Sequence, residues 1–325
     1  MKPTQSVLQV FQSRKMAALL FLGFASGLPL LLTGTTLQAW MTVEGVSLKS
    51  IGLFSLVGLP YSFKFLWSPI LDRFIPPFLG RRRGWLILTQ GALLLAIGAM
   101  ALQNPSQALQ LLAINALIIA FLSATQDIAF DAYRTDVLEN HEMGAGAAIA
   151  VLGYRIALLV AGSLAFFLAK LSSWPTVYLV LAVLMAVGMV TALWAPEPEL
   201  RDRPPASLFD AFTLPFIEFF QRLGLARGAF ILAFIVLYKL GDALVNNMAT
   251  PFLLKTGFTE IDLGTFQGVM GLLATIVGLL AGGAFLSKLG INRSLWVFGG
   301  LQAVSNLFYL ALSQVGKNYP LMVVT

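Results

Sequence analysis

The sequence predicts an all-α membrane protein, a bundle of about nine complete transmembrane helices plus the start of a tenth. Three observations carry this prediction. Of the 325 residues, 58% are hydrophobic and only 11% are charged, whereas soluble domains contain about 25% charged residues. Apolar runs of about 20 residues, long enough to cross a bilayer, recur along the chain. Cationic residues gather between these runs, in the loops that set membrane orientation.

The first apolar run begins at Met16 and continues to Met41, which is longer than the apolar core of a signal peptide and predicts a span. A tenth run begins at Tyr319 and stops at Thr325, so we expect a fragment of a longer protein with a truncated second half. The nine complete predicted spans cover residues 16–41, 49–71, 85–102, 108–131, 147–169, 174–195, 229–254, 263–287 and 294–313.

The spans fall into two groups. We expect residues 1–195 to form an N-terminal six-helix half, residues 196–227 a central cytoplasmic loop, and residues 228–325 a partial C-terminal half. A weak internal repeat relates the two groups, because the connection at Gly283–Arg293 has the same place in the second group as the connection around Asp72 in the first. Parallel halves around a site at the midplane are typical of major-facilitator transporters.

Charge counting predicts a cytoplasmic N-terminus, because most loop cations then lie inside and only Lys49, Lys170, Lys255 and Lys317 lie outside. The net charge of +6 therefore reflects topology, and we expect no nucleic-acid partner. The chain has no cysteine, which excludes disulfides, thiolate chemistry and cysteine-held metals. Its one histidine, His141, has no metal-ligand neighbours, so we expect no metal site.

A motif between the second and third spans points to transport. Asp72 lies at a helix end, and a turn and the cationic cluster Arg81–Arg83 follow it. This order is typical of major-facilitator transporters and predicts movement of a solute rather than covalent chemistry. The residues that we assign to a cytoplasmic gate are Asp72, Arg73, Arg81, Arg82, Arg83 and Arg134.

Charges at membrane depth cost several kcal/mol, so each is a functional candidate. In the fourth span Asp127, Asp131 and Arg134 are spaced by four and three residues, which places them on one helical face. Two interpretations stay open for the acids: a proton-coupling site, or a gate lock that pairs with Arg134 or with the Arg81–Arg83 cluster. In the seventh span Lys239, Asp242 and Asn246 also share a face. They form either a structural ion pair or a substrate and proton site, with Asp242 as the coupling acid.

Two further cations within spans, Lys64 and Arg155, are candidate ligands for an anionic substrate. Arg155 is the more specific candidate because a guanidinium group grips a carboxylate with two bonds, whereas Lys64 lies close enough to the interface to snorkel. Uncharged amides on several spans suit a ligand rich in hydroxyl groups and amides. The main ones are Gln38, Gln126, Gln302 and Asn306. Trp40 and Trp67 near span ends are expected in the interfacial aromatic belt.

Several strings are similar to the AmpG muropeptide permeases, a family within the major facilitator superfamily. They are Leu22–Pro29, Leu37–Glu44, Phe63–Pro69, Pro76–Phe78 with Gly80–Trp85, Gln126–Ala132, Gly144–Ala148, Ala195–Pro198 and Val236–Ala243. The resemblance covers nearly the whole chain. Family members are longer, with a complete second half.

The resemblance implies a multi-pass importer of the bacterial inner membrane, driven by the proton gradient without a cofactor. The implied substrate is an anionic amino sugar, N-acetylglucosaminyl-1,6-anhydro-N-acetylmuramic acid, with or without its peptide, recovered for cell-wall recycling and for β-lactamase induction. Its carboxylates match Lys64, Arg155 and Lys239. The lipid bilayer is the surrounding partner, and we expect a monomer.

Two other functions are alternatives to a muropeptide permease. Asp127, Asp131 and Asp136 loosely resemble the aspartate-rich helix ends of intramembrane prenyltransferases. Such an enzyme needs a second acidic cluster, on another helix, to bind the opposite side of its metal ion. The sequence offers no such cluster on the same side of the membrane. Within transporters, the alternative is a related permease for another bulky anion, such as an acyl-CoA or a siderophore.

Overall fold

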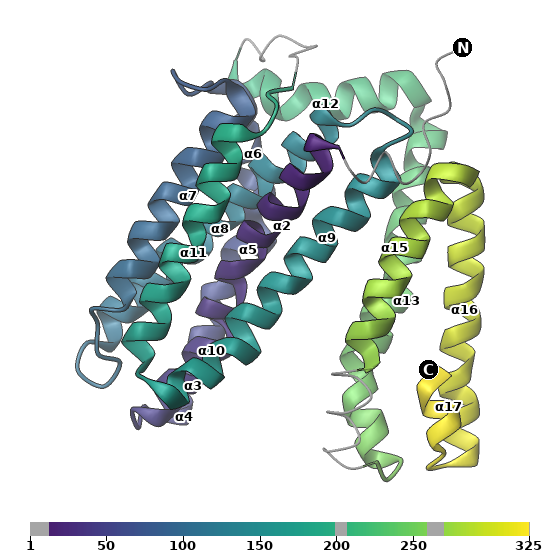
Figure 1. The fold of residues 1–325 in the computed structure, drawn as a ribbon. Coiled ribbons are helices and arrows are strands. Elements are labelled where there is room, and N and C mark those ends of the chain that lie inside the picture. The colour runs from purple at the N-terminus through teal and green to yellow at the C-terminus, as the bar shows by residue number, and fades with distance from the viewer. Residues whose placement is uncertain (1–12, 199–206, 259–269, 325) are drawn as a thin grey trace. The chain divides into compact units, whose positions relative to one another are not determined.

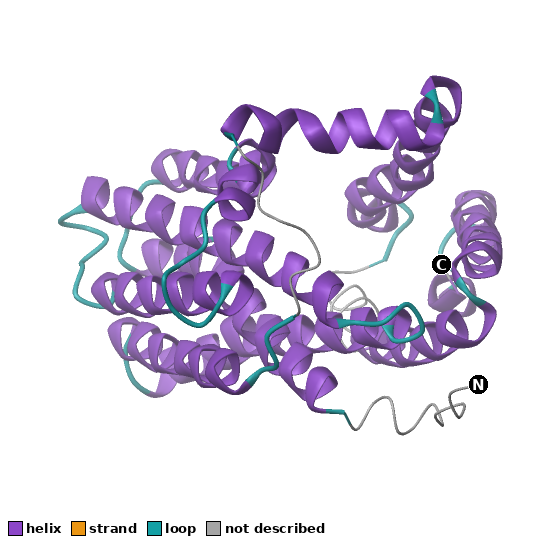
Figure 2. Cartoon of the chain, turned by 90° about the horizontal axis from the view of Figure 1, so that it is seen from above, coloured by secondary structure: helices purple, strands orange, loops and turns teal. Residues whose placement is uncertain are grey.

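A computed structural model describes residues 13–198, 207–258 and 270–324. All regular structure in these ranges is helical, which confirms the predicted all-α fold (Figure 1; Figure 2). The chain forms two compact units, Met1–Phe212 and Thr213–Thr325. Their boundary falls within the segment 196–227 that was expected to connect the halves.

The first unit contains five long apolar helical stretches. Helices α2 (Arg14–Thr33) and α3 (Thr35–Val43) form one stretch with a break at Gly34. The π-helical turn Val160–Leu164 joins α9 to α10. The other members of these stretches are α7 (Arg81–Met100), α8 (Leu109–Val137), α9 (Met143–Leu159), α10 (Ala165–Leu171) and α11 (Trp174–Trp194).

The predicted second span, 49–71, is a chain of short helices rather than one continuous helix. Pro60 and Pro69 each lie in the first turn of a new segment, where a missing N–H leaves no extra unpaired carbonyl. The segments are α4 (Leu48–Leu53), a 3₁₀ turn (Phe54–Gly58), α5 (Leu59–Phe63), a second 3₁₀ turn (Lys64–Leu66) and α6 (Ser68–Arg73). The break matters for function because Lys64 begins the second 3₁₀ turn.

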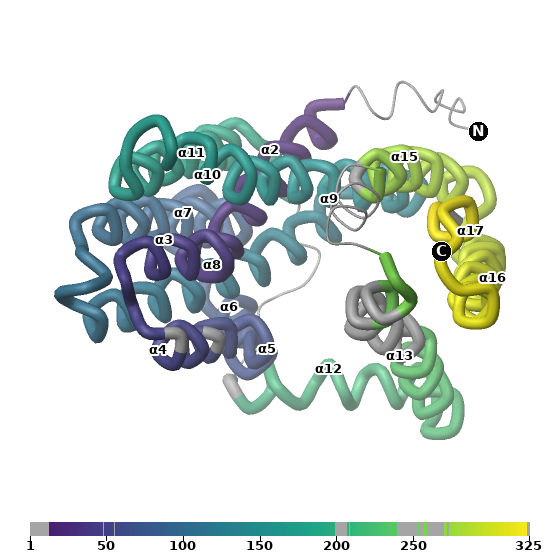
Figure 3. The backbone as a smooth tube through the Cα atoms, turned by 90° about the horizontal axis from the view of Figure 1, so that it is seen from below, coloured from purple at the N-terminus to yellow at the C-terminus, as the bar shows by residue number. Residues whose placement is uncertain are grey.

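Glycines allow α2 to approach α9 closely. A Cβ atom at Gly27 would lie 2.7 Å from the carbonyl oxygen of Tyr154, and Gly23 and Gly153 make similar approaches. Helix α11 packs against both α2 and α7, and α8 packs on the other side of α7 (Figure 3). The prediction for Trp40 was wrong: its side chain is 1% exposed, because it packs on Tyr178 in the core rather than at the interface.

The second unit is built around α13 (Leu225–Lys255), α15 (Gly271–Leu289) and α16 (Ile291–Val315), and α17 (Tyr319–Val324) follows. Helix α12 (Leu208–Leu223) lies in the segment expected to be a loop and was not predicted. Within the described residues, six helical stretches are long and apolar enough to cross a membrane, or seven if one bent pair is counted. The number nine stays a prediction.

Candidate functional site

Two carboxylates on α8 form the centre of the candidate site. Asp127 and Asp131 lie one helical turn apart, and the amino group of Lys64 stands 4.0 Å from the first and 3.7 Å from the second. The break in the second span presents Lys64 to this face of α8. Arg134 also pairs with Asp131, at 3.2 Å, which is one of the two pairings considered for these acids.

Asp127 is the more enclosed of the two acids. Its side chain is 17% exposed, whereas that of Asp131 is 52% exposed. The hydroxyl group of Ser26, on α2, donates a hydrogen bond of 2.5 Å to Asp127. Ser26 was missed at the sequence level, although it is the one hydroxyl-bearing residue in the apolar run Leu22–Pro29. Asp127 is therefore held from α2 and from the broken span while it is carried by α8.

The two acids open into a pocket of about 370 Å³. Arg155 reaches it from α9 with Tyr154 beside it, so cationic and anionic groups face the same space. The lining residues are Ser26, Asp127, Phe130, Asp131, Arg134, Ala150, Val151, Tyr154, Arg155 and Leu158. Chemically, this arrangement pairs cations able to hold a carboxylate with a shielded acid able to exchange a proton.

Arg82 links three elements near one end of the first unit. Its guanidinium group donates to Asp72 of α6 at 2.8 Å and to Asp136 of α8 at 2.6 Å. Asp136 was not among the predicted gate residues. The cluster Arg81–Arg83 does not pair with Asp127 or Asp131 in the structure, because Arg82 is engaged by these other two acids.

Glu197 caps the start of α7. The backbone N–H groups of Arg82 and Arg83 donate to its two carboxylate oxygens at 3.2 and 3.3 Å. Gly80 precedes them with φ +81°, and a Cβ atom there would collide with the Glu197 carboxylate. Burial raises the pKa of Glu197, and the two backbone hydrogen bonds oppose that rise. Glu197 was also missed, because nothing in the local sequence marks a cap for a helix so far back in the chain.

Hydrogen bonds also join the end of α11 to the start of α7 and to α8. The Arg83 side chain donates to the carbonyl oxygen of Ala192 at 2.7 Å and to that of Leu193. The hydroxyl group of Tyr133 donates to the carbonyl oxygen of Pro196 at 3.0 Å. The carbonyl groups of Ala192 and Leu193 are among those that a helix end leaves free. Together with Glu197, these hydrogen bonds fasten the start of α7 to the end of α11.

Other predicted site residues lie elsewhere. Gln126 is fully buried and does not line the pocket, and Gln38 is half-buried on α3. Arg81 is buried at the start of α7, and Arg73 is half-buried at the end of α6. Lys239, Asp242 and Asn246 lie on α13, but their side chains are outside the part of the chain that the structure describes. Their predicted roles stay predictions.

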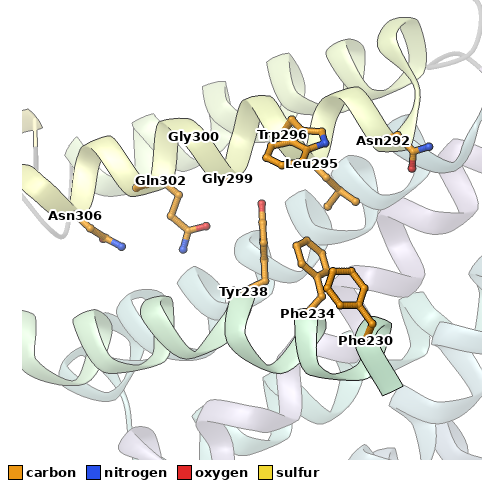
Figure 4. A pocket seen from close by; sticks show the side chains of 11 residues that line it. Phe230, Phe234, Tyr238, Asn292, Leu295, Trp296, Gly299, Gly300, Gln302 and Asn306 are labelled. Atoms are coloured by element: carbon orange, nitrogen blue, oxygen red, sulfur yellow. The ribbon is translucent and has the colours of Figure 1, made fainter. Parts of the chain in front are cut away.

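The second unit has a pocket of its own, of about 810 Å³, between α13 and α16 (Figure 4). Tyr238 extends from α13 toward α16, and Gln302 and Asn306 reach in from α16. These two amides were predicted to suit a sugar-like ligand. Aromatic side chains flank them, so the pocket combines ring faces with amide groups. Its aromatic members are Phe230, Phe234, Tyr238 and Trp296.

Comparisons with known proteins match this architecture. Residues 12–325 match the family described as Major Facilitator Superfamily. The chain is 51% identical over 313 residues to the "Anhydromuropeptide permease" of Escherichia coli strain K12, which covers 96% of this chain and 63% of that protein. It is 42% identical to an uncharacterized protein of Haemophilus influenzae, with 95% of this chain and 73% of that protein covered. It is also 31% identical to "Putative transporter AmpG 4" of Rickettsia felis, with 98% of this chain and 78% of that protein covered.

Proposed function

Because this chain belongs to the Major Facilitator Superfamily and, within it, to the AmpG transporters, we propose that it functions in a muropeptide permease. The chain spans 63% of the length of the E. coli relative. The substrate is N-acetylglucosaminyl-1,6-anhydro-N-acetylmuramic acid with or without its peptide. Uptake runs across the bacterial inner membrane into the cytoplasm, by a monomer whose N-terminus is cytoplasmic and whose energy source is the proton gradient.

The observation that carries this proposal is the charge arrangement around Asp127. Its carboxylate faces Lys64 and accepts a hydrogen bond from Ser26, and the pocket beside it contains Arg155. A muropeptide is an anion, with a lactyl or peptide carboxylate that a guanidinium group can bind through two bonds. The pocket therefore offers a cation to the substrate next to an acid that can take up a proton.

Proton coupling follows from competition for Lys64. While Asp127 and Asp131 are ionised, both hold the amino group of Lys64. A proton on Asp127 removes one of these attractions, so Lys64 is held by Asp131 alone and its charge is more available to the substrate carboxylate. Proton and anionic substrate then favour each other's binding, as symport requires.

The Arg82 network supplies the gate in this proposal. It joins α6, α7 and α8 through Asp72 and Asp136, and Glu197 and Arg83 attach α11 to the same end. These ties make the cytoplasmic end of the first unit a rigid body that moves as one piece during alternating access. Arg73, Arg81 and Arg134 lie at or beside this end as further gate residues.

The test is uptake of radiolabelled N-acetylglucosaminyl-1,6-anhydro-N-acetylmuramic acid into cells that lack their own permease and express the gene to its natural stop codon. We expect uptake that a protonophore abolishes. Uptake that persists with a protonophore would refute proton coupling alone. If a well-inserted protein takes up no muropeptide but transports another bulky anion, such as an acyl-CoA or a siderophore, the proposed substrate is wrong. The family assignment would still stand.

A further inference from the structure

Helix α12 has one strongly apolar face. Phe209, Phe212, Phe216, Phe219 and Leu223 are spaced by three and four residues in alternation, which places all five side chains on one side of the helix. Asp210, Glu218, Gln221 and Arg222 occupy the opposite side. A helix with this division needs an apolar surface on one side and water on the other.

The structure leaves much of that face uncovered. Phe209 is 74% exposed and Phe216 is 67% exposed, whereas Phe219 and Phe220 pack edge to face at 5.3 Å and rest against Gly228 of α13. The contact with Gly228 fixes the angle at which α12 meets α13. It does not cover the phenyl rings farther along α12.

Geometry places α12 next to α13, a helix long enough to span the membrane by itself. Gly224, with φ +75°, is the only residue between α12 and α13, and the two helices meet at 112° (Figure 1; Figure 3). The 31 residues of α13 extend over about 46 Å, which exceeds the bilayer core of about 30 Å without help from α12. The 16 residues of α12 reach only about 24 Å and include three charged side chains.

If α13 crosses the bilayer, α12 must therefore leave it close to the membrane plane. We propose that α12 is an interfacial helix, with its phenylalanine face in the boundary between lipid headgroups and acyl chains. Arg222 and Arg227, on either side of the bend, lie at the level of lipid phosphates and mark this side as cytoplasmic. The occupant of the exposed face is thus lipid, and the segment between the two units is attached to the membrane surface. This inference does not depend on which substrate is carried.

The test compares Phe216→Cys with Glu218→Cys, two exposed positions that are two residues apart and on nearly opposite sides of α12. The 325 residues contain no cysteine, so each variant has a single label site in this segment. Each variant of the full-length protein, with any cysteine beyond this segment replaced, is spin-labelled and reconstituted in vesicles of phosphatidylethanolamine and phosphatidylglycerol. Collision rates with oxygen, which concentrates in lipid, and with a water-soluble nickel chelate are then measured.

We expect the oxygen-to-nickel ratio to be several-fold higher for the label at position 216 than for the label at position 218. Phe209→Cys should repeat the result of Phe216→Cys near the other end of the helix. Equal, nickel-dominated ratios at all positions would show that the face lies in water. Exclusion of both reagents at positions 209 and 216 would show that protein covers it. Either result would overturn the proposal.

Discussion

At the scale of single residues, Asp127 is the point where three elements meet. It is carried by α8, accepts a hydrogen bond from Ser26 of α2, and faces Lys64 of the broken span. A change in its charge therefore acts on all three elements at once. This is the property expected of a residue that couples proton binding to a movement of helices.

Replacing Asp127 by Asn should lower uptake of the labelled muropeptide at least about tenfold, since about 1.4 kcal/mol of lost coupling suffices for that factor. Asparagine keeps the shape and can still accept the hydrogen bond from Ser26, so membrane insertion should be unchanged. Uptake and the amount of inserted protein are both measured. Glu139→Gln, which removes an exposed carboxylate next to α8, serves as the control and should transport normally. Normal uptake by both Asp127→Asn and Arg155→Ala would refute the site.

Glu142, which lies outside the spans, should make the stability of the protein depend on pH. Burial of its carboxyl group opposes ionisation, but hydrogen bonds from the Glu139 N–H and from Lys15 outweigh it, so its pKa lies below the ordinary value of 4.5. A lowered pKa adds stability at pH values above 4.5, and this contribution is lost as the pH falls through the folded-state pKa. In detergent, Glu142→Gln should lower the unfolding temperature at neutral pH, by the equivalent of about 1 kcal/mol or less. The difference in unfolding temperature between this variant and the wild type should become smaller in acid. Glu139→Gln should not show this pH-dependent loss. A difference between Glu142→Gln and the wild type that grows in acid would contradict the prediction.

Some residues of the site can be predicted from the sequence, and others are seen only in the structure. Asp127, Asp131 and Arg134 follow from sequence because helical spacing alone puts them on one face. Ser26, Asp136 and Glu197 do not, because each acts on a partner in a distant segment, and a single sequence contains no signal for such a pairing. Glu197 shows this best, since its carboxylate accepts a hydrogen bond from the backbone N–H of Arg82, 115 residues earlier in the chain.

At the scale of elements, apolar length predicted the long spans well, because a bilayer requires it regardless of tertiary contacts. It did not predict that the second span is divided into short helical segments, or that α12 is a helix. Pro60 and Pro69 each lie in the first turn of one of these short segments. Helix α12 was not predicted because Pro215 and charged residues give the surrounding segment the composition of a loop.

The contact between α2 and α9 allows an element-scale test with a matched pair of substitutions. Gly27→Ala places a Cβ atom 2.7 Å from the Tyr154 carbonyl oxygen and 2.9 Å from Ala157, so the helices must separate. We expect a loss of about 1–3 kcal/mol in stability, together with reduced uptake, since Ser26 and Arg155 lie on the separated helices. Gly98→Ala, in α7, meets its nearest neighbour, the Cβ of Ala182, only at 4.0 Å and should be neutral or stabilising. Thermal unfolding in detergent measures both, and equal effects would contradict close packing as the cause.

At the scale of the whole molecule, the two units share a local design that the sequence repeat predicted. Gly80 precedes α7 with φ +81°, and Gly290 precedes α16 with φ +74°. The acid network differs, however. Asp72 binds Arg82. In the repeated connection Gly283–Arg293, a serine, Ser287, stands at the position of this acid, and its printed hydrogen bond stays within its own helix, to Gly283 at 2.9 Å. The same turn is thus kept in both units, while the ion pairs of Arg82 have no counterpart at Ser287 among the described residues.

Membrane orientation is the last property of the whole molecule that the sequence predicts, and it can be tested directly. Cation counting places the connection between α7 and α8 outside and the connection between α8 and α9 inside. Gln107→Cys and Asn140→Cys put a thiol at an exposed position in each connection, in a chain segment otherwise free of cysteine. In intact spheroplasts, an impermeant thiol reagent should label position 107 at once and position 140 only after permeabilisation. The reverse order of labelling would invert the topology, place the Arg82 network on the outer side, and remove its role as a cytoplasmic gate.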